Sequence, residues 1–316
     1  MEQQQRVREA AALARAIVDN VERVVVGKRQ AIEYTLAAAM AGGHILLEDV
    51  PGLGKTMLAR ALAVSLGLDF RRIQFTADLM PSDIVGGPVY NPKDGSFTLR
   101  LGPVFANVVL ADEINRANPR AQSALLECME EGQLTLDGQT VPLPQPFVVL
   151  ATQNPIDMAG TYPLPEAQLD RFLIRLSLGY PDPKLEASLI DRQQFAHPIA
   201  SLRAACNAQQ FATLTEAARQ VVMSPELAQF ATAIVGATRR SSLVRYGASP
   251  RGTLGLARMA RALSCIRGIP YVDPGIVREV AGPVLAHRIV LQPQVAAQRS
   301  AGAVIQELLA AQATPR

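Results

Sequence analysis

The chain is organised around the stretch Leu46-Leu47-Glu48-Asp49-Val50-Pro51-Gly52-Leu53-Gly54-Lys55-Thr56. An apolar run of strand type leads into a glycine-rich turn, and a helical pattern continues from Met57 to Leu66. Small residues let the backbone wrap around an anion, and N–H groups at the start of the following helix point towards it. This layout predicts a phosphate-binding loop.

One position of the loop departs from the pattern G-x-x-x-x-G-K-[ST], because Asp49 stands where the first glycine is usual. Aspartate tolerates turn conformations, and this position lies farthest from the phosphates, so the prediction stands. Lys55 is expected to reach the outer phosphates and Thr56 to ligate Mg²⁺. The residues expected to hold the phosphates are Gly52, Leu53, Gly54, Lys55, Thr56 and Met57.

The composition is that of a globular protein with room for two domains, since 49% of the 316 residues are apolar and 19% are charged. No apolar run reaches membrane-spanning length, and the polar N-terminus is unlike a signal peptide. The scattered cysteines, Cys128, Cys206 and Cys265, suit a reducing cytoplasm. A net charge of +3 is too small to indicate nucleic acid binding.

Five short apolar runs predict strands, and helical patterns separate several of them. The runs are residues 44–48, 70–75, 107–111, 147–152 and 173–178. Apolar strands that alternate with helices indicate a parallel sheet covered on both faces. The strand signal stops at Pro181-Asp182-Pro183. We therefore expect an α/β core over residues 1–180 and an all-helical domain over residues 181–316.

Two Asp-Gly pairs, each flanked by residues of β type, interrupt this alternation over residues 89–99 and 133–143. Such a pair between alternating runs is the strongest short-range signal for a hairpin. The sequence predicts two hairpin insertions, one before the third strand and one before the fourth.

The third apolar run ends in Asp112 and Glu113. Carboxylates at the carboxyl end of a strand lie where open α/β sheets bind ligands. Asp112 is expected to hold Mg²⁺, directly or through water, and Glu113 to act as the base that polarises the attacking water. The alternative is a pair of acids that caps the next helix.

Asn154 follows the fourth run, where its amide could bind the γ-phosphate or the water; an Asn-Pro turn is an equally good explanation. Arg171 precedes the fifth run and could reach a neighbouring subunit's γ-phosphate. An intramolecular ion pair is the alternative for Arg171, and Arg175 is a competing candidate.

Ser249-Pro250-Arg251 opens a helix of the second domain, with serine at the N-cap and proline in the first turn. Arg251 in that turn opposes the helix dipole, which favours a functional role such as reaching phosphate from the lid side. Val26, in the segment after the N-terminal helix, is expected to bring apolar backbone against an adenine ring.

Together these motifs resemble those of the AAA+ ATPases and, within them, the MoxR family. The resemblance rests on residues 48–56, 111–116, 151–155 and 164–172, and extends from residue 25 to residue 251. It implies a P-loop AAA+ core with a helical lid, and ATP and Mg²⁺ as ligands. It also implies Walker A roles for Lys55 and Thr56 and Walker B roles for Asp112 and Glu113. The remaining implied roles are sensor 1 for Asn154, arginine finger for Arg171 and sensor 2 for Arg251.

The resemblance further implies a ring, usually a hexamer, whose pore is lined by the two hairpins. MoxR proteins are regarded as chaperone-like remodelling ATPases that mature or activate other complexes, often with von Willebrand factor A (VWA) domain proteins. Three other functions fit the same motifs. These are a DNA-acting motor, a metal-chelatase subunit and a scaffold that binds ATP but hardly hydrolyses it.

Overall fold

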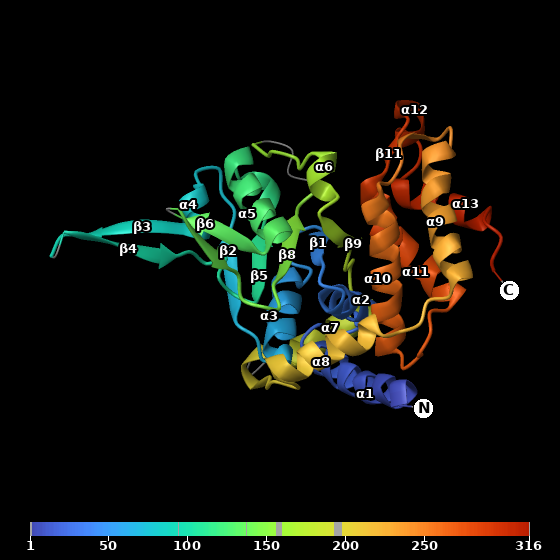
Figure 1. Ribbon diagram of the computed structural model, residues 1–316, viewed down its shortest axis with the longest axis horizontal. Coiled ribbons are helices and arrows are strands. Elements are labelled where there is room, and N and C mark those ends of the chain that lie inside the picture. Colours follow the sequence, from blue (N-terminus) through green and yellow to red (C-terminus); the bar gives the residue numbers. More distant parts are fainter. Residues whose placement is uncertain (1, 94, 137, 156–159, 193–197, 316) are drawn as a thin grey trace.

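The structure is a computed structural model that describes residues 2–93, 95–136, 138–155, 160–192 and 198–315. The centre of the molecule is a five-stranded parallel sheet (Figure 1). Its strands lie in the order β2-β5-β8-β1-β9. Their bounds are β1 His44–Glu48, β2 Phe70–Gln74, β5 Val108–Asp112, β8 Val148–Gln153 and β9 Phe172–Leu176. All five predicted runs are therefore strands of one parallel sheet, and that prediction is confirmed.

The central strands of this sheet are buried on both faces, because neighbouring residues of a strand belong to different hydrophobic clusters, whereas most residues of the edge strand β2 are exposed. On β1, Ile45 and Leu47 join the cluster of α2 (Arg29–Met40) and α3 (Lys55–Leu66). Leu46 joins the cluster of α5 (Pro119–Glu131) on the opposite face. Side chains alternate between the faces of a strand, so burial on both sides requires a continuous apolar run.

The register brings the carboxyl ends of the central strands together. Gln74 at the end of β2 lies opposite Asp112 at the end of β5. Glu48 at the end of β1 lies opposite Gln153 at the end of β8. The phosphate-binding loop follows β1, and Asn154 follows β8, so the two segments begin at adjacent strands. An open parallel sheet binds ligands at this edge.

Both predicted hairpins are present. The first is β3 (Gly86–Asn91) with β4 (Ser96–Leu101), after the short helix α4 (Pro81–Val85). The second is β6 (Gln133–Leu136) with β7 (Gln139–Pro142). Figure 1 shows the first hairpin extending far from the body of the molecule. Several large apolar side chains on it are exposed, including Phe97, which is 68% exposed.

Helices dominate the rest of the chain, as predicted. They are α7 Pro183–Arg192, α8 Ala208–Arg219, α9 Pro225–Arg240, α10 Pro250–Ile266, α11 Pro274–Leu285, α12 Pro293–Ala296 and α13 Ala301–Ala310, with the short helices η2 Pro198–Ser201 and η3 Ala286–Arg288. The expectation of an all-helical domain needs one correction, because β10 (Val244–Tyr246) pairs with β11 (Val290–Leu291). Strands this short show no readable alternation.

The N-terminal helix α1 (Glu2–Glu22) connects the two parts of the chain. It packs against α2 and α3 of the α/β part and also against α8 and α10. One hydrophobic cluster accordingly runs from β1 into α10 and α11. The domain boundary after residue 180 stays a prediction. None of the described helices combines the length and the hydropathy that a bilayer span requires.

Candidate functional site

The loop between β1 and α3 has the backbone that an anion cradle needs. Gly52 and Gly54 have φ angles of 88° and 86°, in the left-handed region that glycine adopts without strain. Gly54 precedes the first residue of α3, and among the residues that the structure describes no side chain caps this helix. The N–H groups of its first turn are thus left for a ligand, at the positive end of the helix.

Lys55 lies in this loop with its ammonium group on the backbone. It donates to the carbonyl oxygens of Asp49 and Val50, the latter at 3.2 Å. Burial lowers the pKa of Lys55, while the carboxylates of Asp49, Asp112 and Glu113 oppose that shift. The half-buried ammonium of Lys55 and the N–H groups at the start of α3 suit a bound polyanion. The nearby carboxylates suit a divalent cation bound with it.

Asp49, the departure from the usual loop pattern, is a buried structural residue. Its carboxylate accepts hydrogen bonds from the Ser177 hydroxyl at 2.6 Å and from the backbone N–H groups of Leu178 and Gly179 at 2.6 and 3.3 Å. The side chain therefore joins the start of the loop to the segment after β9. A glycine at position 49 could not make this connection.

The carboxyl end of β5 is held by hydrogen bonds from both neighbouring strands. From β8, the Thr152 hydroxyl donates to Oδ1 of Asp112 at 2.6 Å and accepts the backbone N–H of Glu113 at 2.8 Å. From β2, Arg72 donates to Oδ2 of Asp112 through Nε at 3.0 Å and Nη2 at 2.7 Å. These bonds fix the position of the Asp112 carboxylate at the carboxyl end of the sheet.

Glu113 has a φ angle of 57° and is the one non-glycine residue with a positive φ among the described residues. Such a conformation costs free energy, and it is concentrated at functional sites. Its carboxylate accepts a hydrogen bond from Nε2 of Gln74 at 3.0 Å and pairs with Arg116 at 3.3 Å. Glu113 lines the same pocket as the residues of the phosphate-binding loop.

These groups surround a pocket of about 360 Å³. The residues that line it are Pro51, Gly52, Gly54, Lys55, Thr56, Met57, Arg72, Asp112, Glu113, Thr152 and Asn154. The structure thus brings together most of the predicted phosphate, metal and base residues. Leu53 is not among the lining residues. Thr56 and Asp112 supply a hydroxyl and a carboxylate oxygen, donors that fit Mg²⁺.

Sequence reasoning missed Thr152, Arg72 and Gln74. A signal exists for Thr152, which lies near the end of β8, two residues before Asn154. Arg71-Arg72 in a strand next to the acidic one was a second signal, since charged residues are unusual in a covered sheet.

Arg171 and Arg251 do not line the pocket. Both bind Glu130 of α5, with Nη2 of Arg171 at 2.8 Å from Oε2 and Nη2 of Arg251 hydrogen-bonded to Oε1. The intramolecular ion pair considered for Arg171 is therefore present in this chain. Arg175 lies on β9, where it pairs with Glu48 at 3.1 Å.

Val26 does not line the pocket either, but its segment lies against the end of the α/β part. Nζ of Lys28 donates to the carbonyl oxygen of Tyr180 at 2.8 Å. Gly27 has a φ angle of 73°, and a Cβ there would lie 2.3 Å from Cδ1 of Leu185. The segment is thus packed closely where β9 leads into α7. A role for Val26 in adenine binding stays a prediction.

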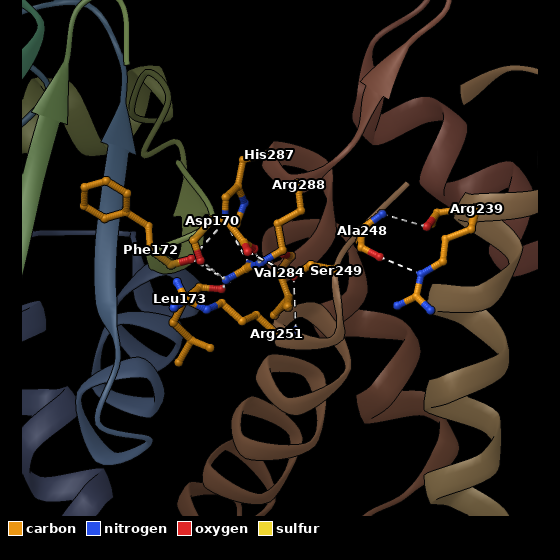
Figure 2. Close-up of polar contacts among 11 residues, drawn as sticks. Asp170, Phe172, Leu173, Arg239, Ala248, Ser249, Arg251, Val284, His287 and Arg288 are labelled. Carbon is orange, nitrogen blue, oxygen red and sulfur yellow. Dashed lines mark hydrogen bonds and ion pairs between the residues drawn. The ribbon is translucent and has the colours of Figure 1, made fainter. Parts of the chain in front are cut away.

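Buried groups also join the helical part to the edge of the sheet (Figure 2). The Arg288 guanidinium donates to Oδ1 of Asp170 at 2.8 Å and to the carbonyl oxygen of Leu173 at 3.0 Å. The Ser249 hydroxyl donates to Oδ2 of Asp170 at 2.9 Å. Asp170 and Ser249 directly flank the segments that carry Arg171 and Arg251, so these segments are fixed relative to each other.

Comparisons with known proteins agree with this architecture. Residues 44–174 match the model of the "ATPase family associated with various cellular activities (AAA)", and residues 236–308 match that of an AAA lid domain. The chain is 46% identical to the uncharacterized protein YeaC of Bacillus subtilis (strain 168), over 94% of this chain and 93% of the relative. It is 44% identical to the chaperone MoxR1 of Mycobacterium tuberculosis, over 90% of this chain and 77% of the relative.

Two further comparisons concern a named relative and a solved structure. The protein MoxR of Paracoccus denitrificans is 33% identical over 88% of each chain. A crystal structure of a presumed ATPase from Cytophaga hutchinsonii superposes with a TM-score of 0.92 at 38% identity, over 99% of this chain and 98% of that one.

Proposed function

The chain belongs to the MoxR family of AAA+ ATPases, and on this basis we propose that it binds and hydrolyses ATP with Mg²⁺ at the pocket between β1, β5 and β8. The observation that carries the proposal is the meeting of an uncapped helix N-terminus, Lys55, Asp112 and Glu113 around one pocket. Amides and Lys55 would bind the phosphates, and Thr56 and Asp112 would hold Mg²⁺. Bound Mg²⁺ would neutralise charge that develops on the phosphates.

We propose that Glu113 is the general base and that Asn154 orients the attacking water. Glu113 enters the pocket from a strained backbone, and its carboxylate is held by Gln74 and Arg116. Asn154 is buried and lines the same pocket from the next strand. A carboxylate positioned beside the γ-phosphate can accept the proton of the water that attacks it.

The position of two predicted site arginines supports a site that is completed by a second copy of the chain. Arg171 and Arg251 share Glu130 and do not line the pocket of their own chain. We propose that Arg171 enters the pocket of a neighbouring subunit, as an arginine finger does. Because Arg251 contacts the same carboxylate, we propose that it serves the same neighbouring site. This arrangement requires a ring, for which we propose a hexamer.

We further propose that this ring remodels a protein client in the cytoplasm and works with a VWA-domain partner. The β3–β4 hairpin supports a client-binding role, since it projects from the body and exposes the paired rings of Tyr90 and Phe97. We propose that hydrolysis moves the hairpins against the bound client.

The dependence of ATPase rate on protein concentration tests the proposal. A finger supplied in trans requires the rate per subunit to rise as subunits assemble. Arg171→Ala should keep ATP binding and lose turnover by about a thousandfold, while Lys55→Ala should weaken binding and Glu113→Gln should retain unhydrolysed ATP. A rate per subunit that is independent of concentration, with normal turnover in Arg171→Ala, would refute a shared site.

A further inference from the structure

Glu130 is the point at which the α/β part and the helical part share a charge. It lies near the end of α5, and its two carboxylate oxygens contact one arginine each: Oε2 is 2.8 Å from Arg171, and Oε1 is bonded to Arg251. About a third of the Glu130 side chain is exposed, so this contact lies at the surface. One carboxylate thus fixes the separation between two guanidinium groups from segments 80 residues apart in sequence.

The segments that carry the two arginines are joined by hydrogen bonds. The carboxylate of Asp170 accepts hydrogen bonds from Ser249 and from the buried Arg288, so the residue before Arg171 is bound to the N-cap of α10 (Figure 2). Arg171 and Arg251 therefore extend from two segments that are already held together. The backbone contacts do not restrain the long side chains of the two arginines. Glu130 is the group that restrains both side chains.

Such a restraint has two physical effects. Two guanidinium groups brought to one place repel each other, and a carboxylate between them offsets that repulsion. Each arginine side chain also loses rotamer entropy when it is ordered, a cost that is already met if the side chain is held beforehand. In the described part of the chain neither guanidinium has another side-chain partner, so their other N–H groups can bind a phosphate while Glu130 stays in place.

We propose that Glu130 is a positioning residue that presents Arg171 and Arg251 as a pair to the triphosphate bound by the neighbouring subunit. The inference rests on the proposed function, because it assumes that the arginines act in trans. It adds that Glu130 serves the neighbour's site and not the site of its own chain.

The first test compares Glu130→Gln with wild type. The variant keeps the size of the side chain but places an amide group, itself a donor, against one of the arginines. We expect turnover to fall on the order of tenfold to a hundredfold, with unchanged ATP affinity and melting temperature. Glu127→Gln is the matched control: Glu127 lies one turn away on the exposed side of α5 and should tolerate the same charge change. Wild-type turnover in Glu130→Gln would overturn the proposal.

The second test asks which site Glu130 serves, by mixing subunits. Glu113→Gln subunits have no working base of their own but carry intact Glu130, Arg171 and Arg251. When they are mixed in excess with Glu130→Gln subunits, the working sites of the latter receive correctly held arginines from their neighbours. Turnover per working site should then rise towards the wild-type value. No rise would mean that Glu130 acts within its own chain, which contradicts the proposal.

Arg171→Ala subunits, mixed with Glu113→Gln subunits in the same way, distinguish a failure of the shared site from a failure of the role of Glu130. If Arg171→Ala is not rescued, the site is not shared between subunits, and the proposed arginine finger in trans fails with it. If Arg171→Ala is rescued and Glu130→Gln is not, the shared site stands and only the role of Glu130 is rejected.

Discussion

The hydroxyl of Thr152 connects the two acidic residues at the end of β5: it donates to Asp112 at 2.6 Å and accepts the backbone N–H of Glu113 at 2.8 Å. Thr152 is 1% exposed, and a methyl group in place of its hydroxyl could bind neither residue. This one hydroxyl orients the proposed metal ligand and also anchors the strained backbone of the proposed base.

Thr152→Val should therefore harm both stability and turnover. It keeps the shape of the side chain but leaves a buried N–H without its acceptor, which should lower the free energy of unfolding by about 1–3 kcal/mol. ATP turnover should fall as well, because Glu113 loses its anchor. Thr152→Ser, which keeps the hydroxyl, is the control in urea unfolding and ATPase assays. Equal behaviour of the valine and serine variants would show that the hydroxyl is not needed.

Asp49→Gly would restore the usual loop pattern, yet we expect it to damage the protein. The substitution removes an acceptor of three hydrogen bonds from residues 177–179, two of them with backbone N–H groups. The free energy of unfolding should fall by about 2–3 kcal/mol, measured by urea unfolding, with no gain in ATP affinity. Ser177→Ala, which removes one of the three bonds, should cost less. A glycine variant as stable as wild type would disprove the role assigned to Asp49.

Stability should decrease in mild acid because of His44. Its Nδ1 accepts the N–H of Val149 at 3.0 Å, so the ring is neutral with its proton on Nε2, which donates to the carbonyl oxygen of Met129 at 3.1 Å. Burial lowers the pKa of His44 to about 4. As the pH falls below about 6.5, the unfolded chain binds a proton that the folded chain does not.

The contribution of His44 should thus be constant above pH 6.5 and reduce the free energy of unfolding by up to about 1.4 kcal/mol per pH unit between pH 6.5 and 4. Urea unfolding of wild type and of His44→Gln across this range isolates it, since carboxylates contribute equally to both proteins. Parallel pH profiles would argue against a neutral buried imidazole.

Arg288→Met should destabilise the junction between the sheet and the helical part. The Arg288 side chain is 3% exposed and pairs with Asp170 at 2.8 Å. Removing one partner of a buried ion pair leaves the other uncompensated, which costs about 3–5 kcal/mol. The double variant with Asp170→Asn should lose less than the sum of the two single variants, measured in a double-mutant cycle. Additive losses would mean that the two residues do not interact.

The strands and the hairpins were predictable because their signals are local. Burial on both faces makes each central strand of a covered parallel sheet a continuous apolar run, as in residues 44–48. The Asp-Gly pairs indicated both hairpins because a turn signal is also contained in a few consecutive residues. The β10–β11 ribbon escaped prediction because strands of three and two residues carry no pattern.

The site was predictable only in part. Lys55, Thr56, Asp112 and Glu113 lie in motifs whose chemistry is contained in a few consecutive residues. Thr152 and Gln74 act across strands, and their partners depend on the strand order and register, which are set by packing of the whole sheet.

By itself, the sequence determined an α/β core with a phosphate-binding loop, two hairpins and a helical second part, because these follow from local periodicity and from the geometry of short motifs. Only the tertiary structure decided that Asp49 binds residues 177–179, and that Arg171 and Arg251 meet on Glu130. Contacts between residues so far apart in the chain depend on how complete elements pack, and no local pattern of residues encodes that packing.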